Sequence, residues 1–361
     1  MSVQTDFIRG KAGLTGILEG ISRARIGLIG DLCLDMYMDV DMRLSELSRE
    51  VPNYTLPVVG ERVSPGGAGN VAANLAALKP KALRVLGVLG QDWRGGLLKE
   101  ALRARGVPTD GLVISPRATT NAYIKPVRRG YSDLLYESPR LDYENREALS
   151  DGDEAALMEA LERAAQEVDV LCVCDQLKNG CVTGRIRRRV CELARDGLRV
   201  IVDSRDRIGE YRDVIVKPNE MEAMRALNLN GAVTPERMAQ AALNLNGAVT
   251  LERMVQAALA LSERSGRPAL ITLGENGCLA AEDGRVAHIP ARRVSGPTDI
   301  CGAGDSFLAA LACALGGGAD IRAAAALGNL GASVTIAKLG ETGTASRAEL
   351  MRAFEDCCGG I

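Results

Sequence analysis

Seven residues near the C-terminal end of the chain have the types and the order that group-transfer chemistry needs. The run 299–305 reads Asp-Ile-Cys-Gly-Ala-Gly-Asp and precedes small and apolar residues typical of a buried helix. Glycine allows a tight turn before a helix, so the unpaired N–H groups of Gly302, Ala303 and Gly304 could converge on an anion. The carboxylate of Asp305 beside them could accept a proton from a nucleophile. For this run taken alone, an ordinary glycine-rich turn capped by aspartate is an equal alternative.

A second glycine-rich turn lies in the first third of the chain. Gly66 and Gly67 belong to the run Pro-Gly-Gly-Ala-Gly-Asn at 65–70, which leads into an alanine-rich helical pattern. Glycines allow a ligand to approach the backbone closely, and Asn70 can both donate to and accept from hydroxyl groups. A dinucleotide-binding fingerprint fits poorly, because the spacing differs and the turn follows a β-like segment instead of the first strand.

Composition excludes several classes of function. The 361 residues are 47% apolar and 25% charged, with a net charge of −2 spread along the chain. This balance is typical of a soluble globular protein and gives no sign of a nucleic-acid groove or a membrane surface. No apolar run is long enough to span a bilayer, and the N-terminus lacks the pattern of a signal peptide. We therefore expect a cytoplasmic protein.

The cysteines and the single histidine limit the available chemistry. The ten cysteines include no C-x-x-C pair, so we interpret them mainly as buried, reduced thiols. His288 is the only histidine, which excludes histidine-based triads and histidine-rich zinc sites. A general base must therefore be a carboxylate, lysine, tyrosine or cysteine.

Apolar runs alternate with helical patterns along most of the chain. A buried strand is predicted at 25–31, with similar runs at 83–89, 169–174, 198–203, 213–217 and 268–273, and helices at 7–21, 151–167 and 184–196. This alternation predicts an α/β fold with a parallel sheet covered on both faces. Ligands of such sheets bind at the carboxyl ends of the strands, where polar residues follow the apolar runs: Asp31, Asp92, Asp175, Asp203 and Asn219.

Three segments depart from this pattern. Residues 37–62 and 112–144 are richer in Tyr, Val, Thr and Pro, and we interpret them as a small β-structured lid over the strand ends; irregular surface loops are the alternative. Residues 226–257 contain two similar copies 16 residues apart. Two copies are too few for a solenoid, so we expect a local tandem duplication that lengthens a surface segment without touching the chemistry.

Taken together, these motifs resemble the ribokinase-like, or phosphofructokinase B-type, carbohydrate kinase family. The resemblance rests on Gly30-Asp31, the turn at 66–70, the run at 299–305 and Asn219-x-x-Glu222, and it spans about residues 26–343. The family implies a single kinase domain over 1–361, a three-layer α/β/α fold with a small β lid, and ATP and Mg²⁺ as cofactors, with a K⁺ requirement left open. It also leads us to expect a homodimer.

Within that family the chain is most similar to heptose-7-phosphate kinases of the ADP-heptose pathway. The similar runs are 30–35, 47–52, 140–144, 174–180 and 338–340. The resemblance implies transfer of the γ-phosphoryl group of ATP to D-glycero-β-D-manno-heptose 7-phosphate, giving the 1,7-bisphosphate. Two alternatives stay open: a kinase of another sugar or nucleoside, and a catalytically silent sugar- or nucleotide-binding protein.

The resemblance also assigns roles to single residues. Asp305 would be the base, with Gly302, Ala303 and Gly304 stabilising the transferred oxygens, and Asn219 and Glu222 would hold Mg²⁺ through water. Helix capping is the alternative for this last pair. The expected sugar-binding residues are Asp31, Asp35, Gly66, Gly67, Asn70 and Asp92, with Lys125, Arg140 and Lys178 as candidates for the acceptor's phosphate. The expected nucleotide-binding residues are Asn219, Glu222, Thr272, Gly274, Gly277 and Asn329.

One part of the catalytic run departs from the family pattern. Ile300 and Cys301 stand where the family usually has Thr-Thr or Val-Thr, so a hydroxyl near the phosphates is lost. A thiol close to a helix N-terminus tends to have a lowered pKa. We therefore expect an active enzyme that thiol alkylation at Cys301 inhibits and ATP protects.

Overall fold

The protein is described by a computed structural model that covers residues 7–130, 135–227, 251–340 and 342–358. Most of the duplicated segment, including all of 228–250, lies outside these residues. Within the described ranges, the helices are each too short or too polar to cross a membrane.

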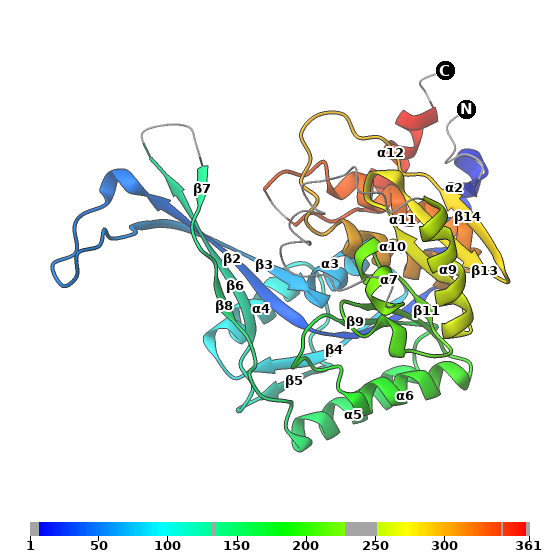
Figure 1. The fold of residues 1–361 in the computed structure, drawn as a ribbon, viewed down its shortest axis with the longest axis horizontal. Helices are drawn as coiled ribbons and strands as arrows, with labels where there is room; N and C mark the ends of the chain where they lie inside the picture. The colour runs from blue at the N-terminus through cyan, green and yellow to red at the C-terminus, as the bar shows by residue number, and fades with distance from the viewer. Residues whose placement is uncertain (1–6, 131–134, 228–250, 341, 359–361) are drawn as a thin grey trace.

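A large, mostly parallel sheet forms the centre of the molecule (Figure 1). In the described residues it has nine strands in the order β14-β13-β12-β11-β10-β9-β1-β4-β5. Only β13 and β14, at one edge, run antiparallel to their neighbours. The strands are β1 (Arg25–Gly30), β4 (Ala82–Gly90), β5 (Leu112–Ser115), β9 (Val170–Asp175), β10 (Arg199–Ser204), β11 (Ile215–Val216), β12 (Ala269–Thr272), β13 (Cys278–Glu282) and β14 (Arg285–Ile289).

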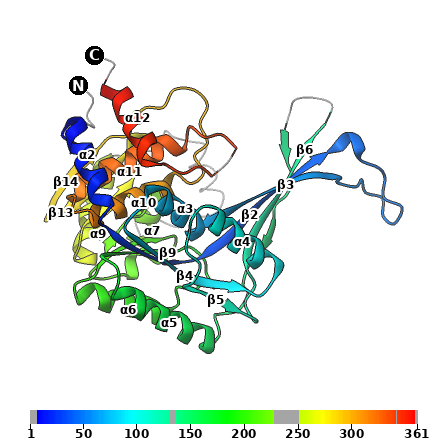
Figure 2. The same ribbon diagram turned by 180° about the vertical axis from the view of Figure 1, so that it is seen from behind.

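Helices cover both faces of this sheet, which confirms the predicted three-layer α/β class (Figures 1 and 2). Side chains of β1 alternate between the layers: Ile26 and Leu28 belong to one apolar core and Ile29 to the other. The first layer contains α2 (Gly10–Ile21), α3 (Ala68–Leu78), α4 (Trp93–Ala104), α10 (Ala303–Gly316), α11 (Ile321–Thr335) and α12 (Arg347–Cys358). The second contains α5 (Asp151–Ala165), α6 (Gly184–Arg195), α7 (Glu220–Ala226) and α9 (Leu251–Ser265).

A second, smaller sheet projects from the body and corresponds to the predicted lid (Figure 1). Its strands are β2 (Leu32–Asp41), β3 (Val58–Gly67), β6 (Asn121–Arg129), β7 (Leu135–Glu137) and β8 (Leu141–Tyr143). The predicted boundary at 112 is wrong, because β5 pairs in parallel with β4 in the main sheet. The small sheet also begins before 37 and ends after 62, since β2 continues directly from β1 and β3 leads directly into α3.

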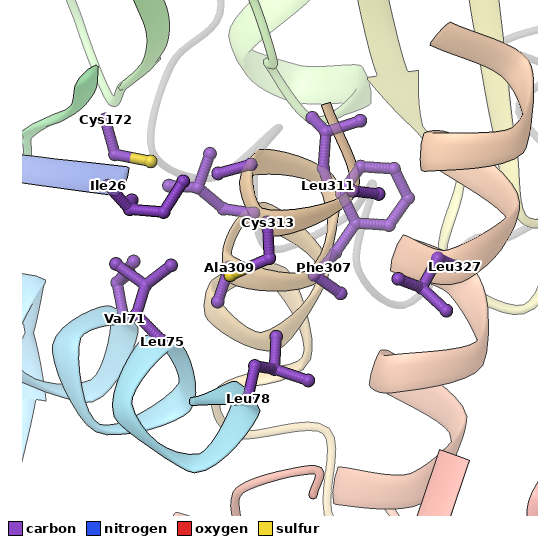
Figure 3. Close-up of a cluster of buried hydrophobic side chains, with 14 of the residues drawn as sticks. Ile26, Val71, Leu75, Leu78, Cys172, Phe307, Ala309, Leu311, Cys313 and Leu327 are labelled. Atoms are coloured by element: carbon purple, nitrogen blue, oxygen red, sulfur yellow. The ribbon is translucent and has the colours of Figure 1, made fainter. Parts of the chain in front are cut away.

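Small residues allow the helices of the first layer to approach closely. Side chains from β1, β9, α3, α10 and α11 gather around α10, as Figure 3 shows. A Cβ atom at Gly328 of α11 would lie 2.8 Å from the ring of Phe307 on α10, so glycine is required at that contact. This packing fixes α10 against α3 and sets the position of the residues at its N-terminus.

Most of the described cysteines lie in the cores. Six of the eight whose surroundings are described are buried, in agreement with the sequence-based interpretation. Cys191 is half-buried and Cys301 is exposed.

Candidate active site

Asp305 and Asn70 meet where α10 and α3 begin. The amide Nδ2 of Asn70 donates a hydrogen bond of 2.7 Å to Oδ2 of Asp305. Gly302, which precedes α10, has φ of +79°, and a Cβ atom there would lie 2.6 Å from Nδ2 of Asn70. The turn therefore needs glycine both for its backbone conformation and for the close approach of the amide.

The surroundings of Asp305 favour its protonated form. Burial raises the pKa of this carboxyl to about 7; the Asn70 hydrogen bond and Lys217 oppose the rise, and the charges of Asp203 and Asp35 add to it. A carboxylate with a pKa near neutrality is well suited to accept a proton at neutral pH. Asp305 thus has the acid–base property that its predicted role requires.

The backbone donors near Asp305 are only partly available. The N–H of Ala303 donates to the carbonyl of Ile300 at 3.2 Å and closes the turn before α10. The N–H of Gly304 has no backbone acceptor among the residues that the structure describes. Ala303 and Gly304 both line the cavity beside Asp305. The N–H groups predicted to bind the anion are therefore not equally available in this conformation, because that of Ala303 is already bonded within the turn.

A buried ion pair that sequence reasoning missed lies next to this turn. Lys217 is 3% exposed, and its Nζ is 2.9 Å from Oδ2 of Asp203, at the end of β10. A Cβ atom at Gly304 would lie 3.9 Å from the same Nζ. The sequence did contain a signal, because Lys217 directly follows a short apolar strand and a lysine is rarely buried without a partner.

The residues predicted to bind nucleotide surround one cavity together with Asp305. This cavity has a volume of about 460 Å³, which is within the range of small-molecule binding sites. It is lined by every one of the predicted nucleotide and metal residues: Asn219, Glu222, Thr272, Gly274, Gly277 and Asn329. Lys217, Asp203 and Gln176 line it as well. Segments far apart in sequence thus converge on one site, because the strands before them are parallel.

Asn219 and Glu222 form the capping box that was the structural alternative for this pair. Oδ1 of Asn219 accepts from the N–H of Glu222 at 2.9 Å, and Oε2 of Glu222 accepts from the N–H of Asn219 at 2.8 Å. Burial raises the pKa of Glu222, and the Asp203 carboxylate raises it further. Oε1 of Glu222 accepts no hydrogen bond within the described residues, so it is the atom that fits water-mediated contact with a hard cation.

Other nucleotide-side residues shape the cavity. The amide of Asn329 donates to the carbonyl of Ile289 at 2.8 Å and holds α11 against the end of β14. Gly277 has φ of +87°, and a Cβ atom there would lie 2.2 Å from the Ile289 carbonyl oxygen. Gly274 begins the short 3₁₀ helix η3 (Gly274–Asn276), which follows Thr272. Asn329 and Gly277 therefore set the wall of the cavity.

On the lid side, Asp35 lies where β2 crosses the glycine-rich turn. A Cβ atom at Gly66 would lie 2.4 Å from Oδ2 of Asp35, so glycine makes room for this carboxylate. Burial raises the pKa of Asp35, and the charges of Lys125 and Arg140 oppose the rise. Nζ of Lys125 donates to the Tyr37 hydroxyl at 3.1 Å. The lid thus brings Lys125 and Arg140 near the Asp35 carboxylate, whose charge also raises the pKa of Asp305.

Two of the predicted sugar-binding carboxylates, Asp31 and Asp92, accept hydrogen bonds from within the protein. Oδ2 of Asp31 accepts from the N–H groups of Gln176 at 2.9 Å and Leu177 at 2.8 Å, and Oδ1 accepts from that of Cys181 at 2.7 Å. Asp31 is 3% exposed. Asp31 therefore anchors the loop at 176–181, and its predicted contact with the sugar stays a prediction.

Asp92 caps the N-terminus of α4. It accepts from the N–H of Gly95 at 2.8 Å and that of Thr120 at 3.0 Å, and it pairs with Arg94 at 2.8 Å. These bonds lower its pKa despite the effect of partial burial.

Gly67, another predicted sugar-side residue, directly precedes α3. Its φ of +54° is a backbone conformation that favours glycine.

Two predicted residues remain, Cys301 and Lys178. The pKa of the Cys301 thiol is raised, chiefly by partial burial and next by Asp299, so the expectation of a lowered value is wrong. Cys301 precedes the helix, and its N–H donates to the Asp299 carboxylate, which places a negative charge beside the thiol. Lys178 lies in a separate cavity that adjoins the first at Gln176.

The fold is that of the ribokinase-like proteins. Ribokinase from Arabidopsis thaliana, solved with ribose and ATP, aligns with 92% of this chain and 99% of its own, with a TM-score of 0.68 and 21% identity. Phosphofructokinase-2 from Escherichia coli, solved with substrates and products, aligns with a TM-score of 0.66 and 18% identity over 93% of this chain and 99% of its own.

The chain belongs to the pfkB family of carbohydrate kinases, whose profile matches residues 28–347. Its curated relatives include the bifunctional protein HldE of Azorhizobium caulinodans, which is 34% identical over 92% of this chain. HldE of Gluconobacter oxydans is 33% identical over 93% of this chain. The chain spans 64% and 65% of the lengths of these two relatives. Membership of this family makes the protein a phosphotransferase that acts on a sugar hydroxyl.

Proposed function

We propose that this kinase transfers the γ-phosphoryl group of ATP to the anomeric hydroxyl of D-glycero-β-D-manno-heptose 7-phosphate. The observation that carries the proposal is the hydrogen bond of 2.7 Å between Asn70 and Asp305, which joins the sugar-side turn to the catalytic turn. The similarity to the HldE proteins supports a heptose phosphate as acceptor.

In this mechanism Asp305 accepts the proton of the acceptor hydroxyl. The hydroxyl oxygen forms a bond to the γ-phosphorus, and the bond from that phosphorus to the β,γ-bridging oxygen breaks, so that ADP leaves. The free N–H of Gly304 and the ammonium of Lys217 lie on the side where negative charge develops. Asp35 and Asn70 orient the sugar hydroxyls.

Glu222 and Asn219 would hold Mg²⁺ through water, and the ion would neutralise phosphate charge during transfer. The free Oε1 atom of Glu222 and its place in the cavity with Asp305 support this assignment. The same cavity residues would contact ATP, with Asn329 and Gly277 supporting its wall. A K⁺ requirement and a homodimer belong to the proposal as family expectations, to be tested by ion substitution and by light scattering.

A coupled assay of ADP release tests the function. Wild-type protein is offered heptose 7-phosphate, fructose 6-phosphate, ribose and a nucleoside, and we expect heptose 7-phosphate to give the highest kcat/KM. Asp305→Asn should lower kcat by a factor on the order of 10² to 10⁴. Preference for another acceptor contradicts the heptose assignment, and full turnover by a correctly folded Asp305→Asn protein contradicts the proposed base.

A further inference from the structure

A cavity beside the proposed catalytic site is lined by cations from three parts of the chain. It has a volume of 470 Å³ and shares Gln176 with the cavity that contains Asp305. Arg146 lies between β8 and α5, Lys178 follows β9, and Arg205 follows β10. All three side chains are exposed at this cavity.

These three cations have no hydrogen-bond or ion-pair partner for their side chains in the part of the chain that the structure describes. Among the described residues, none of the side chains of Arg146, Lys178 and Arg205 takes part in a hydrogen bond or an ion pair. By contrast, the two predicted phosphate ligands on the lid are occupied: Arg140 pairs with Asp142 at 2.6 Å, and Lys125 bonds to Tyr37 at 3.1 Å. Unlike Arg140 and Lys125, the three cations of this cavity are thus free to bind an anion.

The carboxylates that line the same cavity are already bonded. Asp142 is bound by Arg140, and Asp206 is bound by Arg225. Glu144 accepts from the Tyr123 hydroxyl at 3.2 Å. An entering anion would thus find three unpaired cations, whereas each of the three lining carboxylates already accepts a hydrogen bond within the described residues.

The backbone that carries Lys178 and Arg205 is held firmly. Asp31 binds the N–H groups of Gln176, Leu177 and Cys181, so both ends of the loop around Lys178 are fixed. The N–H of Arg205 donates to the carbonyl of Asp175 at 3.1 Å. Arg207 joins the two segments, since its guanidinium binds the Asp175 carboxylate and, at 2.7 Å, the Leu177 carbonyl. Such a scaffold pre-organises the two cations for a ligand and lowers the entropic cost of binding.

We propose that Lys178 and Arg205, with Arg146 at the entrance, form the subsite for the phosphate monoester of the sugar-phosphate acceptor. The inference rests on the proposed function and adds how the acceptor's distal end is recognised. With its phosphate in this cavity, the acceptor would extend past Gln176, and its reacting hydroxyl would point toward Asp305. Charge-assisted bonds to phosphate would then distinguish sugar phosphates from free sugars.

Calorimetric titration of wild-type protein, Lys178→Gln and Arg205→Gln tests the subsite, with heptose 7-phosphate, unphosphorylated heptose and ATP as ligands. Each variant should raise the Kd for heptose 7-phosphate about tenfold or more, and leave those for heptose and ATP unchanged. Arg188→Gln is the matched control, because Arg188 is an exposed arginine on α6 with no partner among the described residues. An unchanged Kd for heptose 7-phosphate, or equal weakening toward heptose, overturns the proposal.

Two further measurements distinguish the acceptor's phosphate subsite from a site for free phosphate, and the subsite from the kinase reaction. Inorganic phosphate should compete with heptose 7-phosphate for wild-type protein; simultaneous binding of both would mean a site for free phosphate and overturn the assignment. ADP release, measured in parallel, separates the subsite from the function. Weakened binding in the variants without turnover by the wild type would refute the kinase reaction alone, whereas wild-type turnover with unaltered binding in the variants would refute the subsite alone.

Discussion

The Nδ2 atom of Asn70 lies 2.7 Å from Oδ2 of Asp305, although 235 positions separate the two residues in the chain. The contact joins the turn that follows the lid strand β3 to the turn that precedes α10. It couples the part of the site expected to bind sugar to the carboxylate expected to remove a proton. Several predictions about activity depend on this pair and on its neighbours.

The pH profile should report the ionisation of Asp305. Because the carboxyl has a raised pKa of about 7 and only the ionised form accepts a proton, kcat/KM should rise with pH up to about 7 and level off above it. The profile is measured with acceptor below its KM and ATP saturating, and with a coupling system shown not to limit the rate. A flat profile between pH 5.5 and 8 would contradict this role for the carboxylate.

Replacing Asn70 should move that profile. The hydrogen bond from Asn70 lowers the pKa of Asp305, so Asn70→Ala should shift the acid limb of kcat/KM to higher pH and reduce the rate at pH 7. Asn74→Ala is the matched control, since Asn74 lies one turn further along α3 and bonds to Asn70 and not to Asp305. Identical profiles for the two variants would argue against a specific effect of the Asn70 bond.

Gly302→Ala should damage the site. The positive φ of +79° is unfavourable for alanine, and the new Cβ would lie 2.6 Å from Nδ2 of Asn70. We expect a loss of about 1 kcal/mol or more in the free energy of unfolding, together with reduced kcat. Gly304→Ala tests the steric argument through denaturant unfolding, because its nearest neighbour would be 3.9 Å away. Equal stability of the two variants would refute it.

Alkylation of Cys301 should be selective but slow. Cys301 is exposed, whereas six of the other described cysteines are buried, so it should be labelled first. Its raised pKa keeps the thiol protonated at neutral pH, and the labelling rate should therefore increase as the pH rises. Mass spectrometry after timed exposure to iodoacetamide, with and without ATP, measures labelling alongside activity. Unaffected turnover after complete labelling would show that this position does not face the reaction.

Much of the fold was predictable because it depends on local patterns. The apolar runs that became β1, β4, β9, β10 and β12 are long and bounded by polar residues, and the helical patterns between them left a parallel sheet as the consistent arrangement. The boundary at 112 was placed wrongly because β5 has only four residues, and the composition of so short a strand does not indicate which of the two sheets it joins. Its partner β4 decides where it belongs.

The site was predicted less completely, because the role of a polar residue depends on its partners. Asp31 and Asp35 are four residues apart and look alike in sequence, yet Asp31 binds three backbone N–H groups and Asp35 lies against Gly66. Lys217 was overlooked although it directly follows a short apolar strand, and Arg205 was overlooked because nothing local distinguishes it from a surface charge. The burial of Lys217 beside Asp203 and the position of Arg205 in the same cavity as Lys178 indicate their roles.

The sequence by itself determined the class of fold, the two glycine-rich turns and the acidic residue at 305, since these depend on residue type and short-range order. The tertiary structure decided which side chains share a site and which are consumed in holding it together. The physical reason is that hydrogen bonding and desolvation act over a few ångströms in space, and parallel strands bring distant segments within that range.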